Sequence, residues 1–283
     1  MQNRFTPTPQ IRSSEISRIG VFDSGVGGLT VLQEIYRQLP NESVLYFGDT
    51  ARVPYGTRSA AEILKFTRQT LDWMVSQRVK MAIVACNTSS ALALETVRDE
   101  YDLPILGVVL PGARAAARQG RRIGVIATPA TVKSNAYLYA IQEANPRAQV
   151  WQVACPEFVP LIENNRLAEP YTLAIAKEYL QPLLDRQIDT LVYGCTHYPH
   201  LEPILRTFVP SNIQFVNPAI SVVTAAAKEL QILGIQSQRV IPTTFLVSGD
   251  PTKFSHLATQ WLPARPIVEQ IVLPTVPVSE VKS

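Results

Sequence analysis

The sequence predicts an α/β protein built from two similar lobes, each with a mainly parallel sheet flanked by helices. Short runs of β-branched and apolar residues alternate with longer amphipathic stretches along most of the chain, a pattern typical of parallel sheets with covering helices. The 283 residues are 46% hydrophobic and 17% charged, which is enough apolar material for two modest cores. Strand signals that recur at a nearly constant offset indicate that the fold is duplicated.

Strand and helix signals alternate from residue 19 onward. A strand is expected at Ile19 to Phe22, and a helix at Leu29 to Leu39, where apolar side chains recur at helical spacing. A longer helix is expected over 87–101, and another near Pro199, a residue suited to a first helical turn. The remaining strand candidates are 44–47, 81–85, 105–109, 123–127, 149–153, 190–193, 213–216 and 244–247.

Two pairs of similar strings carry the evidence for duplication. Ile19-Gly-Val-Phe recurs as Ile123-Gly-Val-Ile, and Ile105-Leu-Gly-Val recurs loosely as Ile213-Gln-Phe-Val, at offsets of 104 and 108 residues (123 − 19 and 213 − 105). We therefore expect two lobes that face each other across a cleft, with the chain crossing between them near Pro111-Gly112. The expected divisions are a flexible leader at 1–17, a first lobe of 18–112 plus about 223–272, a second lobe of 113–222 and a tail at 273–283.

Charge and hydropathy exclude several classes of partner. The formal net charge of +3 comes from 26 basic and 23 acidic residues, and the longest basic cluster is only Arg121-Arg122, so a nucleic-acid partner is not expected. No apolar stretch approaches the roughly 18 residues that span a bilayer. The polar N-terminal residues lack the apolar centre of a secretion signal, so we expect a cytoplasmic protein without membrane contact.

The three cysteines do not form a recognisable framework. Their separations of 69 and 40 residues (155 − 86 and 195 − 155) fit neither a set of disulfides nor the CxxC spacing of a zinc site. Cys155 lies in no polar cluster and is interpreted as a buried structural residue. Cys86 and Cys195 need a different explanation.

Three apolar strands are each followed at once by a small polar cluster, and two of the clusters begin with a cysteine. Ligands of open parallel sheets bind beyond the carboxyl ends of the strands, so these clusters are expected to line the cleft between the lobes. The clusters are Asp23-Ser24-Gly25, Cys86-Asn87-Thr88 and Cys195-Thr196-His197.

Cys86 and Cys195 occupy matching places in the duplicated halves, 109 residues apart (195 − 86). Each thiol is expected near a helix N-terminus, an environment that can lower the pKa of a thiol and hold a substrate carboxylate. Two such thiols suit racemisation, because one thiolate removes an α-proton while the opposite thiol supplies a proton to the other face. Fixed donors in a water-excluding cleft would stabilise the carbanion. Suitable donors are Ser24, Asn87, Thr88 and Thr196.

Five strings, taken together, resemble the glutamate racemase family, and they occur in that family's order between residues 18 and 220. The resemblance implies a two-lobed α/β fold, interconversion of L- and D-glutamate for peptidoglycan synthesis, neither a cofactor nor a metal, and a homodimer. The strings are Asp23-Ser-Gly-Val-Gly-Gly-Leu-Thr, Gly48-Asp-Thr-Ala-Arg-Val-Pro-Tyr-Gly56, Ala85-Cys-Asn-Thr88, Pro111-Gly-Ala-Arg-Ala-Ala and Gly194-Cys-Thr-His-Tyr-Pro199.

The same resemblance implies roles for individual residues. Cys86 and Cys195 would be the two acid/base groups, with Asp23 beside the first, His197 beside the second and Glu163 near the second. The substrate's ammonium and carboxylates would be held by Asp23, Ser24, Tyr55, Gly56, Asn87, Thr88, Thr196 and His197.

Plainer interpretations of these residues are also open. His197 could be a core histidine, Asp23 a helix cap and Glu163 a solvated charge. The glycine-rich turn at 25–28 fits no phosphate-binding motif, so close backbone approach to a substrate or helix packing explains it more simply. Cys195, His197 and His200 make a poor zinc site.

Three other functions compete with glutamate racemisation. A racemase for another amino acid, such as aspartate, would use the same chemistry. A non-catalytic amino acid binding protein would keep the cleft without turnover, and retention of both thiols argues against it. A cysteine-dependent decarboxylase would need only one of the thiols.

Overall fold

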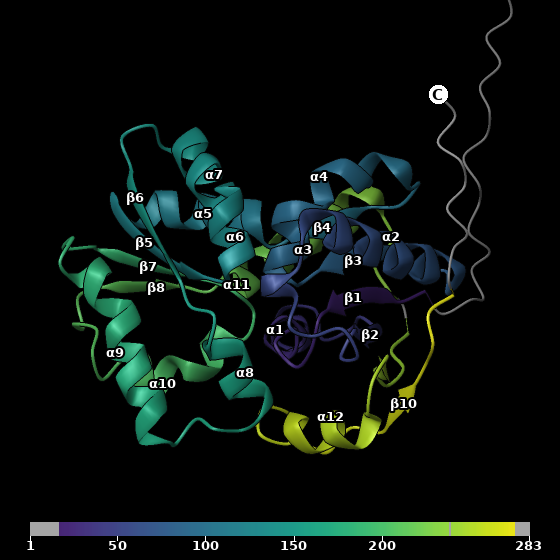
Figure 1. The fold of residues 1–283 in the computed structure, drawn as a ribbon. Coiled ribbons are helices and arrows are strands. Elements are labelled where there is room, and N and C mark those ends of the chain that lie inside the picture. The colour runs from purple at the N-terminus through teal and green to yellow at the C-terminus, as the bar shows by residue number, and fades with distance from the viewer. Residues whose placement is uncertain (1–16, 238, 275–283) are drawn as a thin grey trace, which may run out of the picture.

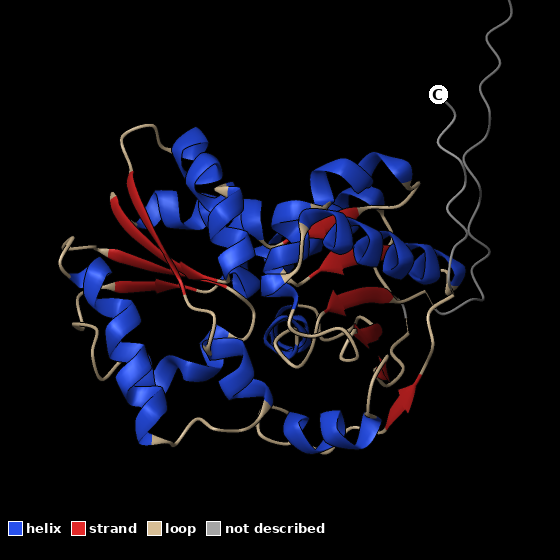
Figure 2. Cartoon of the chain, in the orientation of Figure 1, coloured by secondary structure: helices blue, strands red, loops and turns tan. Residues whose placement is uncertain are grey.

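The chain folds into two parallel sheets, each flanked by helices (Figures 1 and 2), which confirms the predicted fold class. The computed structural model describes residues 17–237 and 239–274, so most of the predicted leader and tail lies outside the described residues. The first sheet has the order β10-β9-β2-β1-β3-β4 and the second β6-β5-β7-β8. The strands are β1 (Ile19–Asp23), β2 (Val44–Gly48), β3 (Met81–Val84), β4 (Ile105–Gly107), β5 (Arg122–Ala127), β6 (Gln149–Ala154), β7 (Thr190–Gly194), β8 (Gln214–Val216), β9 (Thr244–Val247) and β10 (Val268–Gln270).

The duplication is visible in the order of the strands. Strands β2-β1-β3-β4 of the first sheet correspond one by one to β6-β5-β7-β8 of the second, and all the paired strands are parallel. The sequence repeats at Ile19 and Ile123 are therefore the central strands β1 and β5. All nine predicted strands are present. Only β10 was missed, because just one of its three residues is apolar and the other two are exposed.

Helices cover the faces of both sheets, and several begin with a capping side chain. Ser59 and Glu62 form a reciprocal capping box at the start of α2, and Asn217 accepts a hydrogen bond from the Ala219 amide at the start of α11. The helices are α1 (Leu29–Gln38), α2 (Ala60–Ser76), α3 (Asn87–Leu92), α4 (Leu94–Val97), α5 (Val109–Gln119), α6 (Pro129–Ser134), α7 (Ala136–Ala144), α8 (Phe158–Glu163), α9 (Pro170–Leu184), α10 (Glu202–Leu205), α11 (Pro218–Leu233) and α12 (Pro251–Ala258), with 3-10 turns η1 (Tyr55–Thr57), η2 (Arg98–Glu100) and η3 (Tyr198–Leu201).

Two predicted helices differ from those in the structure. The continuous helix expected over 87–101 is broken at Ala93, whose backbone leaves the helical region, so α3 has only six residues and α4 and η2 follow as separate turns. The break lets Leu94 pack closely against Gly107 of β4. The helix expected near Pro199 is the 3-10 turn η3, which precedes the single turn of α10.

Two helices join the halves of the molecule. Helix α5 leaves β4 of the first sheet and leads into β5 of the second, and the Pro111-Gly112 step lies within its first turn. Helix α11 leaves the second sheet and packs against both α5 and α1. At Gly112, a Cβ atom would lie 2.8 Å from the Pro218 ring, so a glycine is needed for the two helices to approach. Among the described residues, no helix is both long and apolar enough to cross a membrane.

A buried ion pair fastens the segment after α11 to the first half. Lys80 Nζ lies 2.6 Å from Glu42 Oε2, and the two side chains are 3% and 4% exposed. The same ammonium donates to Ile235 O and Ser237 Oγ, and Glu42 accepts from the Ser237 amide and hydroxyl. Every charge and donor of this cluster is thereby paired with a neighbour.

We expect Lys80→Met to lower the free energy of unfolding by about 3–5 kcal/mol, because it leaves the Glu42 carboxylate buried without its cation. Urea unfolding measures the change. Arg37→Met, which breaks an exposed pair with Glu34, is the control and should leave the unfolding midpoint unchanged within error. Equal midpoints for both variants would show that the buried pair does not stabilise the fold.

Candidate active site

The carboxyl ends of β1, β3 and β7 converge where the two halves meet. Asp23 ends β1, Cys86 follows β3 by one residue, and Cys195 follows β7 directly. Three hydrogen bonds join the halves here. Thr196 Oγ1 donates to Asp23 Oδ1 at 3.0 Å, the Val26 amide donates to Glu163 Oε1 at 3.0 Å, and Thr30 Oγ1 donates to Thr196 O at 3.3 Å. The polar clusters predicted from the sequence therefore face one another.

Cys86 lies in a buried environment that keeps its thiol neutral. The residue caps α3 and is 4% exposed, with Sγ 3.9 Å from Ser24 Oγ. The pKa of Cys86 is raised to about 12, mainly by burial and also by the charges of Asp23 and Cys195, against the opposing hydrogen bonds of Ser89. The expectation that a helix N-terminus lowers this pKa was wrong, because the six-residue α3 cannot offset desolvation.

Cys195 stands at one end of a three-residue chain of contacts. Its Sγ lies 3.7 Å from His197 Nδ1, and His197 Nε2 lies 2.8 Å from Glu163 Oε1. Burial opposes protonation of the imidazole, but the hydrogen bonds to Cys195 and Glu163 outweigh it and raise the pKa of His197 well above 6.5. Burial likewise opposes ionisation of Glu163, yet its bond to His197 keeps the carboxyl pKa below its usual value. The pair is therefore an imidazolium and a carboxylate, held against the sulfur.

The surroundings of Cys195 differ from the prediction in one respect. The first helical turn after it, η3, begins three residues later and is followed only by the single turn of α10. The segment that follows Cys195 therefore does not place the N-terminus of a long α-helix beside this sulfur. The neighbouring charge comes from the side chain of His197 instead.

The glycine turn after β1 lies directly against this chain of contacts. A Cβ at Gly25 would lie 2.0 Å from Glu163 Oε1, and one at Gly27 would lie 2.3 Å from His197 Nδ1. Only glycine allows the first half to approach the side chains of the second half so closely. Asp23, at the base of the turn, accepts from the Gly25 amide at 2.9 Å, and burial raises the pKa of its carboxyl.

The start of α3 contacts two residues of the second half, Thr128 and Tyr137, that the sequence analysis did not single out. Thr88 Oγ1 lies 3.0 Å from Thr128 Oγ1, and Tyr137 donates its hydroxyl proton to Asn87 Oδ1 at 2.6 Å. Thr128 follows β5 as Ser24 follows β1, so the internal repeat could have identified it. Tyr137 sits in the strongly apolar helix α7 and carries no signal in the sequence that separates it from a core residue.

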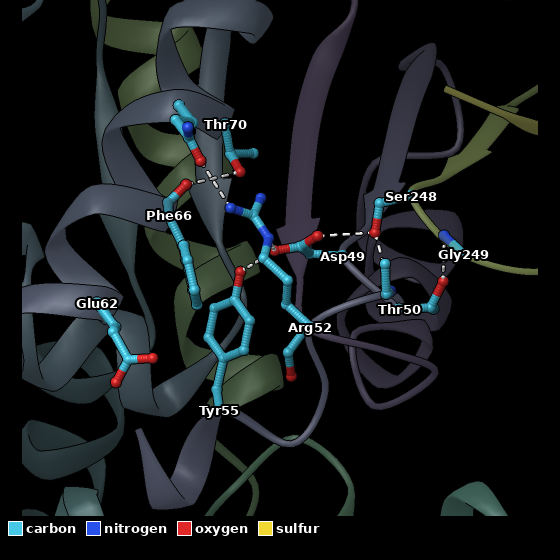
Figure 3. A network of polar contacts seen from close by, with 12 residues as sticks. Asp49, Thr50, Arg52, Tyr55, Glu62, Phe66, Thr70, Ser248 and Gly249 are labelled. Atoms are coloured by element: carbon cyan, nitrogen blue, oxygen red, sulfur yellow. Dashed lines mark hydrogen bonds and ion pairs between the residues drawn. The ribbon is translucent and has the colours of Figure 1, made fainter. Parts of the chain in front are cut away.

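Tyr55 and Gly56 form the turn η1 beside Thr128. A Cβ at Gly56 would lie 2.5 Å from Thr128 Cβ, so this turn of the first half also touches the second. The Tyr55 side chain is buried, and its hydroxyl donates to Asp49 (Figure 3). Most residues predicted for the site thus contact or closely approach the opposite half. These are Asp23, Gly56, Asn87, Thr88, Glu163, Thr196 and His197.

Two residues considered in the sequence analysis lie outside these contacts. Cys155 is fully buried, its Sγ approaches Val153 O at 3.6 Å, and its carbonyl accepts from Tyr198, all consistent with a structural role. His200 stacks on Trp261 with ring centroids 3.8 Å apart, and burial lowers its pKa to about 3. Within the described part of the chain, no group of three His, Cys, Asp or Glu side chains is arranged to hold a metal ion.

A pocket with a volume of about 390 Å³ opens between the halves beside Ser90 and Ala91 of α3, and not beside its first residues, Asn87 and Thr88. None of the residues predicted for the site lines it. Its walls come from α3, α4, η2, β4, α5 and α7, and include Ser90, Arg98, Arg114 and Tyr139.

Comparison with known proteins gives the family. Residues 19–230 match the Asp/Glu/Hydantoin racemase family. The chain belongs to this family. It is 64% identical over 265 residues to a glutamate racemase of Gloeothece citriformis, an alignment that covers 93% of this chain and 95% of the relative. The crystal structure of a glutamate racemase isoform from Bacillus anthracis has a TM-score of 0.87 and 38% identity, and covers 91% of this chain and 98% of that one.

A further member of the family was crystallised with an amino acid. The glutamate racemase of Francisella tularensis, in complex with D-glutamate, has a TM-score of 0.85 and 36% identity to this chain. The match covers 91% of this chain and 97% of that one.

Glu163→Gln should lower the pKa of His197, because the variant removes a hydrogen-bonded negative charge while burial still opposes protonation. NMR titration of the imidazole protons measures this pKa, and the chain has only three histidines to assign. Glu157→Gln is the control, since Glu157 contacts Tyr171 and Tyr179 rather than His197. An unchanged His197 titration in Glu163→Gln would refute the ion pair.

The stability of the protein should fall with rising pH because of Cys86. Its folded pKa of about 12 exceeds the ordinary value of 9.0, so the neutral thiol's contribution is complete below 9.0 and is lost as the pH rises towards about 12. Relative to Cys86→Ser, which does not ionise, the wild type should lose about 1.4 kcal/mol per pH unit in this window. Urea unfolding at several pH values above 9.0 tests this. Parallel pH dependences would mean that Cys86 titrates normally.

Proposed function

We propose that this chain interconverts L- and D-glutamate, without a cofactor, by proton transfer at Cα between Cys86 and Cys195. The observation that carries the proposal is the placement of two buried thiols at equivalent ends of β3 and β7 in a duplicated fold. A reaction whose substrate and product are mirror images needs one proton-transfer group on each face of the carbon. Solved relatives named as glutamate racemases, one of them holding D-glutamate, support glutamate over aspartate.

The two thiols have different partners, which gives each a different route for its proton. The imidazolium of His197 faces the Cys195 sulfur and is held there by the Glu163 carboxylate, so it can hold or return a proton during the step. Cys86 has Ser24 as its neighbour, and burial keeps it neutral. In this state Cys86 is suited to supply the proton when Cys195 removes one. The reverse enantiomer requires the two roles to exchange.

Polar groups around the sulfurs are suited to a small zwitterion. Asp23, buried at the end of β1, would accept hydrogen bonds from an ammonium group. Carboxylate oxygens would be held by hydroxyl and amide donors, and the low exposure of the site strengthens such contacts by excluding water. The residues we propose to supply these donors are Ser24, Tyr55, Gly56, Asn87, Thr88, Thr196 and His197. Tyr55, Thr196 and His197 would act through their backbone amides, because their side chains already contact Asp49, Asp23 and Glu163.

The cellular setting follows from the same proposal. D-glutamate is a component of peptidoglycan, so the reaction would supply cell-wall synthesis. We propose a cytoplasmic location for the protein, glutamate as its small-molecule partner, no binding to nucleic acid, and assembly as a homodimer.

In deuterated buffer, L-glutamate should lose optical rotation and gain deuterium at Cα without any added cofactor. Cys86→Ala and Cys195→Ala should each abolish racemisation, because each removes the proton donor or acceptor on one face. Cys155→Ala is the matched control: it removes the third buried thiol and should keep near-native turnover.

The same assay separates the competing functions. Near-native turnover in Cys86→Ala or Cys195→Ala would refute the two-thiol assignment. Faster exchange with aspartate than with glutamate would identify a racemase of the other substrate. Glutamate binding without deuterium uptake would identify a non-catalytic binding protein.

A further inference from the structure

The loop that carries Tyr55 and Gly56 is held by a segment from the far end of the chain. It runs from the end of β2 to the start of α2, and its base lies beside the turn that follows β9, because β9 pairs with β2 (Figure 3). Ser248, in that turn, stands 193 residues after Tyr55 in sequence (248 − 55). Nothing in the chemistry proposed above uses this turn.

The Asp49 carboxylate joins the two segments. It is fully buried, with Arg52 Nε at 2.6 Å from Oδ2 and the Tyr55 hydroxyl donating to the same oxygen. Ser248 Oγ donates to the other oxygen, Oδ1, at 2.7 Å. The carboxylate is thus held from both sides, so its orientation depends on Ser248 and in turn determines where the Tyr55 hydroxyl lies.

Two more hydrogen bonds connect the turn to the loop. The Ala51 amide donates to Ser248 Oγ at 2.9 Å, and the Gly249 amide donates to Thr50 Oγ1 at 3.0 Å. Ser248 therefore uses its single hydroxyl both as a donor to Asp49 and as an acceptor from the loop. Removing that hydroxyl would free both groups at once.

The far end of the loop lies at the proposed site. Gly56 abuts Thr128, which contacts Thr88 at the start of α3. The Tyr55 ring packs edge-on against Phe22, with centroids 6.2 Å apart. A displacement of the loop at Asp49 would consequently move the Tyr55-Gly56 turn relative to both halves.

We propose that Ser248 is a positioning residue, which through Asp49 sets the place of the Tyr55-Gly56 turn and so the affinity for the amino acid substrate. This inference rests on the proposed function. Ser248 contacts neither thiol, so it acts on substrate binding and not on the proton transfer itself. A loosened turn loses binding energy equally in the ground state and the transition state, which raises KM and leaves kcat in place.

Kinetics of Ser248→Ala test the proposal. We expect KM for glutamate to rise about five- to tenfold and kcat to change less than about twofold, the effect of losing one well-placed hydrogen-bonding group. Ser248→Thr, which keeps the hydroxyl, should restore KM. Ser255→Ala is the matched control, because Ser255 lies in the same C-terminal segment and donates to Pro266 O, away from Asp49.

A double-mutant cycle with Tyr55→Phe tests the route through Asp49. Both hydroxyls act on one carboxylate, so the double variant should raise KM by no more than about twofold beyond the larger single effect. Additive effects of the two substitutions would overturn the proposal. So would an unchanged KM in Ser248→Ala, or a fall in kcat at constant KM.

Amide hydrogen exchange provides a readout that needs no turnover. The amides of Arg52 and Arg58 are hydrogen-bonded within the loop and should exchange faster in Ser248→Ala than in the wild type or Ser255→Ala. If the wild type does not racemise glutamate, the proposed function fails, and this exchange still decides whether Ser248 holds the loop. Equal exchange in all three proteins would overturn the positioning role.

Discussion

The contact between the Glu163–His197 pair and the glycine turn after β1 is the constraint on which the site depends. The carboxylate belongs to the second half, yet one of its oxygens accepts both from His197 of that half and from the Val26 amide of the first. A buried carboxylate is tolerated only where such partners surround it. The two halves are therefore fixed relative to each other by the same atoms that set the charge beside Cys195.

This arrangement makes the two thiols chemically unlike, although the strands that carry them are equivalent. Cys195 faces an imidazolium, whereas Cys86 faces the hydroxyl of Ser24 and the negative charge of Asp23. Because the fold is duplicated, each half of the molecule places one sulfur at the end of an equivalent strand. The side chains that follow each strand then determine how each sulfur holds its proton.

Much of the fold could be predicted from the sequence because parallel strands leave a direct signal. Runs such as the one at Ile19 are apolar along their whole length, and the repeat at Ile123 gave the correct correspondence between the sheets. The same repeat predicted that Cys86 and Cys195 lie at equivalent strand ends, and they follow β3 and β7. The break of the helix at Ala93 and the contact of Tyr137 with Asn87 were not predictable, because tertiary packing decides both and no local pattern records it.

The placement of β9 beside β2 has a consequence for how the molecule is made. The strands of the second sheet follow one another within residues 122–216, so that sheet can pair completely as soon as this stretch has left the ribosome. Strand β2 instead keeps an open edge until residues 244–247 emerge and cover it. The edge of β2 therefore stays open while residues 49–243 are synthesised, and the first sheet is completed after the second.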